Sequence, residues 1–125
     1  MSLDITPVIP KGRQLIQSYG DGGFRVADVN YTGSILVFPE RVIGWPVNKP
    51  EDITLDSLKD ATDSEAEIML IGCGPDFLPP PAGLREGLKA LGAALEWMDT
   101  GAACRTSNIL LAEDRAFAAA LVAVE

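Results

Sequence analysis

Apolar and polar positions along the chain divide it into short segments that follow either the strand or the helix period. Near the N-terminus, residues 15–19 are predicted to form a strand, and the glycine-rich segment 20–23 that follows is predicted to reverse the chain. Residues 24–31 are predicted to form the second strand of an N-terminal β-hairpin. Their apolar parity slips halfway, which indicates a β-bulge near Asp28.

Two later segments, 34–38 and 67–71, contain the runs ILVF and IMLI, which are apolar on both faces. Such runs are typical of central strands that are covered on two sides. Between them, residues 42–47 are predicted to form a short extended piece. Leu55 and Leu58 then mark one side of a short helix whose surroundings are acidic, and the acids keep this helix solvated.

The next segment begins with a glycine turn at residues 72–75 and three prolines that lead into a helix. Leu84, Leu88 and Leu91 lie on one side of this helix, and Gly92 ends it. The succession of strand, glycine turn and helix predicts an α/β fold.

The C-terminal part repeats this succession with a strand over 94–98, a helix from 100 to about 113, and a last strand over 117–124. The alanines of the last segment suit a helix equally well. Five residues are expected to form the side of the 100–113 helix that faces the sheet: Ala102, Ala103, Thr106, Ile109 and Leu110.

The length and charge of the chain limit the number of domains and the kinds of partner that it can have. A chain of 125 residues and 13.3 kDa is expected to form one domain over 1–125, with residues 1–12 as an irregular tail. A net charge of -8 disfavours nucleic acid and anionic membranes as partners. The longest apolar run, 116–124, is too short to span a membrane, and the N-terminus lacks the pattern of a secretory signal. We therefore expect a soluble, cytoplasmic protein.

The chain contains no histidine, which removes the usual general base and the commonest metal ligand. We therefore assign no catalytic residue and expect no metal. The glycine turns match neither the dinucleotide-binding nor the P-loop spacing, so no cofactor is expected. Cys73 and Cys104 are too far apart for a redox motif, and we expect both to be buried and reduced.

Most residues capable of chemistry lie in the segment MDTGAACRTSNILLAED, residues 98–114. Asp99 or Thr100 is expected to cap the helix, and a helix N-terminus near Arg105 suits a carboxylate, a phosphate or a partner's acidic side chain. Together with the glycine turn, this segment gives a predicted ligand or partner site of seven residues: Gly72, Gly74, Asp99, Thr100, Gly101, Arg105 and Asn108.

Two alternatives stay open for this segment. Arg105 could instead be a structural partner of Asp99 or Glu113. Asp21 and Arg25 could also join a polar site built around Arg105.

Large apolar residues also occur in predicted loops, at Trp45 and at Phe77 and Leu78. If these three lie together on the surface, they form a patch of the size used for protein contacts. The equal alternative is that they belong to the core.

Several segments together resemble a known family: YGDGGFRV, GSILVFPE with the following Trp-Pro, LPPPAGLREGLKALG and EWMDTGAACRTSNILLAEDR. This family of small uncharacterised domains includes a mitochondrial respiratory complex I assembly factor and many bacterial proteins. The resemblance covers residues 15–124. It implies a three-layer α/β fold with a mixed central sheet and, in mitochondria, a non-enzymatic role in assembling NADH:ubiquinone oxidoreductase. Ser107 stands where the family often has an aromatic residue, and Cys73 where a small residue or threonine is usual.

The leading hypothesis is a non-enzymatic, protein-binding protein that aids the biogenesis of respiratory complex I, with an uncharacterised role in bacteria. The alternative is a small-anion-binding protein, or an enzyme of unknown reaction, that uses a crevice at Arg105.

Overall fold

The computed structural model describes residues 12–125, so almost all of the predicted tail at residues 1–12 lies outside the described part. In this part of the chain, eight strands form two sheets. The antiparallel three-stranded sheet has the order β1-β2-β3 and consists of β1 (Ile16–Gly20), β2 (Gly23–Val26) and β3 (Val29–Thr32). The five-stranded sheet has the order β5-β4-β8-β6-β7 and consists of β4 (Ile35–Phe38), β5 (Arg41–Gly44), β6 (Ile68–Gly72), β7 (Ala94–Met98) and β8 (Phe117–Leu121).

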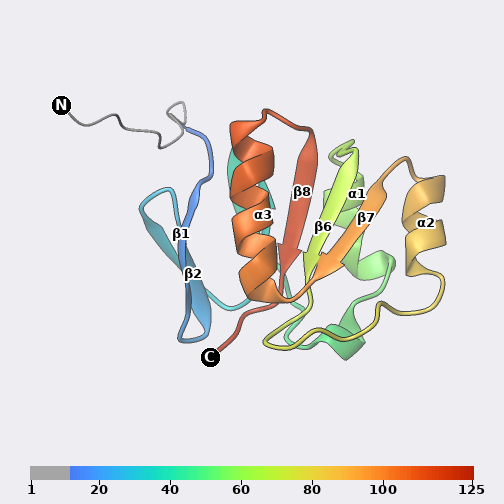
Figure 1. Cartoon of the computed structure of the whole chain (residues 1–125), viewed down its shortest axis with the longest axis horizontal. Helices are drawn as coiled ribbons and strands as arrows, with labels where there is room; N and C mark the ends of the chain where they lie inside the picture. Colours follow the sequence, from blue (N-terminus) through green and yellow to red (C-terminus); the bar gives the residue numbers. More distant parts are fainter. Residues whose placement is uncertain (1–11) are drawn as a thin grey trace.

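The five-stranded sheet is mixed, because β6 runs parallel to both β7 and β8, whereas β4 is antiparallel to β5 and β8. The α-helices are α1 (Lys59–Thr62), α2 (Leu84–Ala90) and α3 (Thr100–Ala112), and two short 3-10 helices, η1 (Pro50–Asp52) and η2 (Asp56–Leu58), precede α1. Figure 1 shows α3 in front of this sheet beside the three-stranded sheet, with α1 behind. The predicted α/β fold with a mixed central sheet is confirmed.

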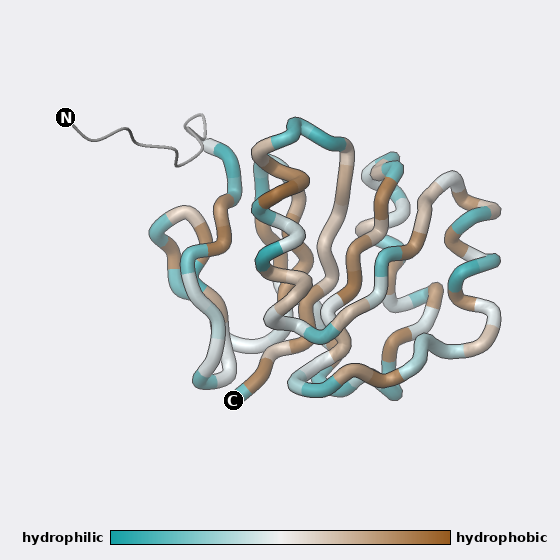
Figure 2. The backbone as a smooth tube through the Cα atoms, in the orientation of Figure 1, coloured by the Kyte–Doolittle hydropathy of each residue, from teal (hydrophilic) through white to brown (hydrophobic). Residues whose placement is uncertain are grey.

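Two apolar clusters fill the layers on the two faces of the five-stranded sheet. Leu36 and Met69 belong to the cluster that also contains residues of α1 and α2, whereas Ile35 and Leu70 belong to the cluster under α3. Neighbouring residues of a strand point to opposite faces, which explains why the ILVF and IMLI runs are apolar throughout. Both runs lie in interior strands, as predicted. Figure 2 shows hydrophilic colour at turns and on the outer sides of helices.

The last segment forms the strand β8, which lies in the centre of the five-stranded sheet with all five residues buried. Tertiary pairing with β4 and β6 decides the conformation that the alanines left open. The prediction of a strand is confirmed, although it ends at Leu121 rather than at residue 124.

The predicted bulge near Asp28 is wrong. Ala27 and Asp28 have positive φ values of 47° and 68° and form a two-residue turn that joins β2 to β3. The apolar parity slips there because the chain reverses. The side-chain amide of Gln17 donates to Asp28 Oδ1 at 2.8 Å, and its oxygen accepts from the Asp28 N–H at 2.8 Å. The predicted hairpin is thus a three-stranded meander, and its irregular pairing lies in β1 between Ile16 and Ser18.

The predicted inward side of α3 is partly wrong. Ala103 and Leu110 are buried as expected, but Ala102 and Thr106 are only half-buried and Ile109 is 56% exposed. The buried residues of α3 are Thr100, Ala103, Cys104, Ser107, Leu110 and Leu111. Small polar side chains occupy this side because α3 lies close to the sheet, so hydrophobicity alone misplaces it. Leu91 is likewise 57% exposed, because α2 ends one residue before it.

Candidate functional site

The start of α3 is joined to two strands by a buried junction around Thr100. The Thr100 hydroxyl donates to the Val122 carbonyl at 2.8 Å and accepts from the Gly74 N–H at 3.0 Å. The Thr100 N–H donates to the Gly74 carbonyl at 2.9 Å. A Cβ atom placed on Gly72 would lie 2.9 Å from Thr100 Cα, so only glycine allows this approach. Gly72, Gly74 and Thr100 therefore connect β6, α3 and β8, and their polar groups are already used.

Of the two predicted caps, Asp99 is the one that caps α3, because its carboxylate accepts from the Ala102 N–H at 2.8 Å. A Cβ atom placed on Gly101 would lie 2.5 Å from the Tyr19 hydroxyl, so Gly101 provides the space under Tyr19. The cap and Tyr19 together occupy the helix end that the sequence offered as an anion site.

Asn108 holds β1 against α3. Its side-chain oxygen accepts from the Ile16 N–H at 2.9 Å, and its side-chain nitrogen donates to the Ile16 carbonyl at 2.8 Å. The amide thus pairs with the backbone of β1 as a neighbouring strand would. Both ends of the Asn108 amide are bonded within the protein.

A groove of about 360 Å³ lies between β1 and α3, and we call it the Arg105 groove. Its lining consists of Ile16, Gln17, Ser18, Tyr19, Cys104, Arg105 and Asn108. The wall formed by β1 was not predicted from the sequence, since no local signal places this strand beside a helix that begins 80 residues later. The polar residues in the sequence IQSYG of β1, most of which are exposed, were the one sequence sign of an incompletely covered strand.

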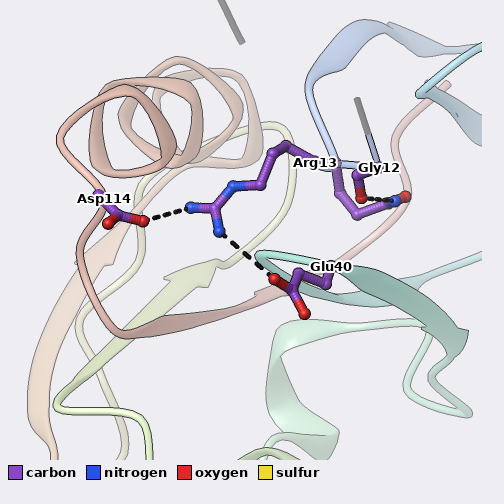
Figure 3. A network of polar contacts seen from close by, with 5 residues as sticks. Gly12, Arg13, Glu40 and Asp114 are labelled. Carbon is purple, nitrogen blue, oxygen red and sulfur yellow. Dashed lines mark hydrogen bonds and ion pairs between the residues drawn. The ribbon is translucent and has the colours of Figure 1, made fainter. Parts of the chain in front are cut away.

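Arg105 differs from the other arginines of residues 12–125. Arg13 donates to Asp114 at 3.0 Å and lies 3.8 Å from Glu40 (Figure 3). The remaining arginines also have partners: Arg25 with Asn30 and Asp28, Arg41 with the Phe38 ring, Arg85 with the Leu95 carbonyl, and Arg115 with Glu113. Within this described range, Arg105 has no hydrogen bond and no ion pair.

The alternative that Arg105 tethers Asp99 or Glu113 is therefore wrong. Asp99 instead caps the helix, and Glu113 lies 3.9 Å from Arg115. Asp21 and Arg25 do not join Arg105 in its groove. They line a neighbouring hollow of about 340 Å³ that shares only Ser18 and Tyr19 with the Arg105 groove.

Cys104 forms the floor of the Arg105 groove and is 3% exposed. Burial raises the pKa of its thiol to about 12, and the opposing effect of the nearby Arg105 is smaller. The thiol is therefore neutral at neutral pH and is a poor nucleophile. Cys73 is also buried and free, as expected, and its thiol donates to the Asp76 carbonyl at 3.5 Å.

The predicted apolar patch is separated by the fold. Trp45 is 4% exposed, belongs to the core, and donates its indole N–H to the Ser57 carbonyl at 2.8 Å. Its inclusion in a surface patch is wrong, because the segment after β5 turns inward over the sheet. Phe77 is 61% exposed and Leu78 is also exposed. We call residues 76–81 the Phe77 loop; bonds from the Cys73 thiol to Asp76 and from the Trp97 indole to Leu78 hold its backbone.

No three His, Cys, Asp or Glu side chains among residues 12–125 are grouped so that they could hold a metal ion. None of the helices in this part of the chain has the length and apolar character needed to cross a membrane.

Comparison with known protein families identifies the family to which this chain belongs. A family described as protein of unknown function (DUF498/DUF598) matches residues 16–122. The chain belongs to the DUF498 family. A DUF498 relative from Rhodobacter capsulatus, named an uncharacterised protein, is 36% identical over 107 residues, which cover 86% of this chain and 82% of the relative.

Other DUF498 relatives carry functional names. The Drosophila melanogaster protein named NADH dehydrogenase (ubiquinone) 1 alpha subcomplex assembly factor 3 is 38% identical over 114 residues, or 86% of this chain. The human protein of the same name is 32% identical over 109 residues. The chain spans 58% and 59% of the length of these two relatives. The expected relationship to complex I assembly factors is confirmed.

Solved structures of similar proteins share the fold. A Bartonella henselae protein, described as an outer membrane protein, has a TM-score of 0.83 and 42% identity, with 94% of this chain and all of that chain covered. A Bordetella pertussis protein described as an Mth938-like domain has a TM-score of 0.81 and 31% identity, with coverage of 98% and 92%.

Proposed function

We propose that this DUF498 protein is a non-enzymatic, protein-binding assembly factor that aids the biogenesis of a respiratory NADH dehydrogenase. The observation that carries the proposal is that relatives named complex I assembly factors match 86% of this chain. The family match over residues 16–122 spans both sheets and α3. A cytoplasmic location and a protein partner belong to the same proposal.

The Phe77 loop is the surface that we assign to the protein partner. Phe77 is the most exposed large apolar side chain in the described part of the chain, and its neighbours Asp76 and Leu78 are each held by a side-chain bond. A loop that is already fixed loses little conformational entropy on binding. An exposed aromatic residue on such a loop suits an anchor in a partner's pocket.

A deletion strain of the source organism tests this proposal. We expect less assembled NADH dehydrogenase on native gels and lower membrane NADH oxidation, with recovery by the wild-type gene. Phe77→Ser should recover less than the matched control Leu91→Ser, because both remove a similarly exposed apolar side chain but only Phe77 lies on the loop. Normal assembly in the deletion strain would contradict the proposal.

The second candidate function is binding of a small anion, or an enzyme of unknown reaction, at the Arg105 crevice. The guanidinium of Arg105 favours it, because this group faces a groove without an internal partner among residues 12–125. Native mass spectrometry of the purified protein tests it. A stoichiometric small anion that is lost in Arg105→Gln, together with normal NADH dehydrogenase in the deletion strain, would favour this second function over assembly.

A further inference from the structure

We propose that the Arg105 groove binds a single carboxylate attached to an apolar group, as found at the C-terminal residue of a polypeptide or in a small carboxylic acid. The proposal rests on the assignment of the groove as a binding site and names the class of ligand that it takes. It does not require that the protein assembles a respiratory complex.

The Arg105 groove contains more free hydrogen-bond donors than acceptors. The amides of Gln17 and Asn108 are bonded to Asp28 and to the backbone of Ile16. Arg105 offers five N–H donors, and the hydroxyls of Ser18 and Tyr19, which also line the groove, have no partner within residues 12–125. A ligand that only accepts hydrogen bonds fits this excess of donors, and a carboxylate pairs with guanidinium through two parallel bonds.

The floor of the Arg105 groove is apolar. Ile16 and Cys104 are buried beneath the groove, and the Cys104 thiol is neutral because burial raises its pKa to about 12. The floor therefore repels no anion and offers apolar contact next to the guanidinium. With about 360 Å³, the groove accommodates a small group such as one amino-acid residue, since pockets for small ligands begin at roughly 300 Å³.

Acidic groups around the Arg105 groove limit the charge of the ligand. A Cβ atom placed on Gly101 would lie 2.5 Å from the Tyr19 hydroxyl and 3.4 Å from Asp99 Oδ1. The Asp99 carboxylate is therefore close to the Tyr19 end of the groove. Asp21 lies in the adjoining hollow, and the whole chain carries a net charge of -8. One guanidinium among these acids balances one negative charge, so a monoanion binds better than a phosphate dianion.

Backbone NMR titration of the full chain tests the proposal, with N-acetyl-leucine, N-acetyl-leucinamide and inorganic phosphate as probes. We expect N-acetyl-leucine to shift the signals of Ser18, Tyr19, Cys104 and Arg105 in a saturable manner. The amide and phosphate should bind at least tenfold more weakly. Arg105→Gln should weaken binding of N-acetyl-leucine at least tenfold, whereas Arg115→Gln, which removes the same charge outside the groove, should change it less than twofold.

The source of the carboxylate is distinguished by a tetrapeptide that ends in leucine. Tighter binding of this peptide than of N-acetyl-leucine, with loss on C-terminal amidation, assigns the groove to a polypeptide terminus. Equal or weaker binding assigns it to a small carboxylic acid.

Three outcomes would overturn the proposal. These are equal binding of the acid and its amide, binding of phosphate at least as tight as that of the acid, and no saturable shift at the groove up to about 50 mM ligand. None of them bears on NADH dehydrogenase assembly in the deletion strain, which tests the proposed function separately. An unchanged spectrum outside the groove in Arg105→Gln shows that the variant is folded.

Discussion

Thr100 and Arg105 lie five residues apart in the same helix, but the protein uses them in opposite ways. Thr100 is 0% exposed, and its hydroxyl is bonded on one side to Val122 and on the other to Gly74. Arg105 is exposed on the groove and has no partner within residues 12–125. The chemically capable residues of segment 98–114 thus have two separate roles in the structure. Thr100 forms a buried structural junction, and Arg105 lies on an open surface.

The helix period explains this division. Five residues correspond to a rotation of about 140° around the helix axis, so the two side chains point to different sides. Thr100 faces the ends of β6 and β8, where backbone groups need partners, while Arg105 faces the gap beside β1. Polar residue type alone therefore does not indicate a ligand site; the number of hydrogen bonds already made distinguishes the two roles.

The largest expected effect follows from removing the Thr100 hydroxyl. Thr100→Val keeps the shape of the side chain but leaves the buried N–H of Gly74 and carbonyl of Val122 without this partner. We expect the free energy of unfolding to fall by about 2 to 6 kcal/mol, measured by urea denaturation, because each of the two unsatisfied buried groups costs about 1 to 3 kcal/mol. Thr106→Val is the control, since that half-buried hydroxyl contacts only the Met98 sulfur. Equal losses in both variants would remove the distinction between the junction and the rest of α3.

A second prediction is that the Cys104 thiol at the floor of the groove makes the stability of the protein depend on pH. The Cys104 thiol has a pKa of about 12 in the folded protein, against 9.0 for the reference value, because it is buried. Between these values the unfolded chain loses the proton and the folded chain keeps it, so stability falls as pH rises. We expect this loss to approach about 1.4 kcal/mol per pH unit above pH 9 relative to Cys104→Ala, and to be absent below pH 8.

Denaturation of wild type and Cys104→Ala across pH 7 to 11 measures this difference. The alanine variant has a lower starting stability because it leaves a small cavity, but it lacks this thiol's contribution to the pH dependence. Parallel curves would mean that the floor is open to water, and the groove would then be less apolar than the structure indicates.

A third, smaller effect is expected at the cap that separates the junction from the groove. Asp99→Ala removes the carboxylate that accepts from the Ala102 N–H. We expect a loss of about 1 kcal/mol, measured by thermal unfolding. Asp99→Asn should retain most of the stability, because its side-chain oxygen still accepts the bond while the charge is removed. A full loss in the asparagine variant would show that the charge of Asp99, rather than its hydrogen bond, stabilises α3.

The sequence predicted the features that depend on local spacing. The apolar runs of β4 and β6, the glycine turn after β6 and the Asp99 cap all follow from neighbouring residues. The turn at Ala27 and Asp28 was missed because it lacks the glycine or asparagine that such turns usually contain.

The missing half of the candidate site has another cause. Asn108 pairs with Ile16 across 92 residues, and this pairing places β1 over α3. No periodicity within either segment encodes that contact. The sequence therefore identified Arg105 but not the strand that forms the other wall of its groove.

The smallest stability effect is expected at Arg105 itself. Because its guanidinium makes no bond within residues 12–125, Arg105→Gln should change the free energy of unfolding by less than about 0.5 kcal/mol. Arg13→Gln is the contrasting variant, since its side chain is mostly buried and contacts both Asp114 and Glu40; it should cost more. Urea denaturation of both variants measures the difference. If Arg105→Gln were as destabilising as Arg13→Gln, Arg105 would have a structural partner. Its guanidinium would then not be free to bind an external ligand in the groove. If its stability is unchanged while carboxylate binding is lost, the contrast with Thr100 holds: one residue of the helix serves the fold, and the other is available for recognition.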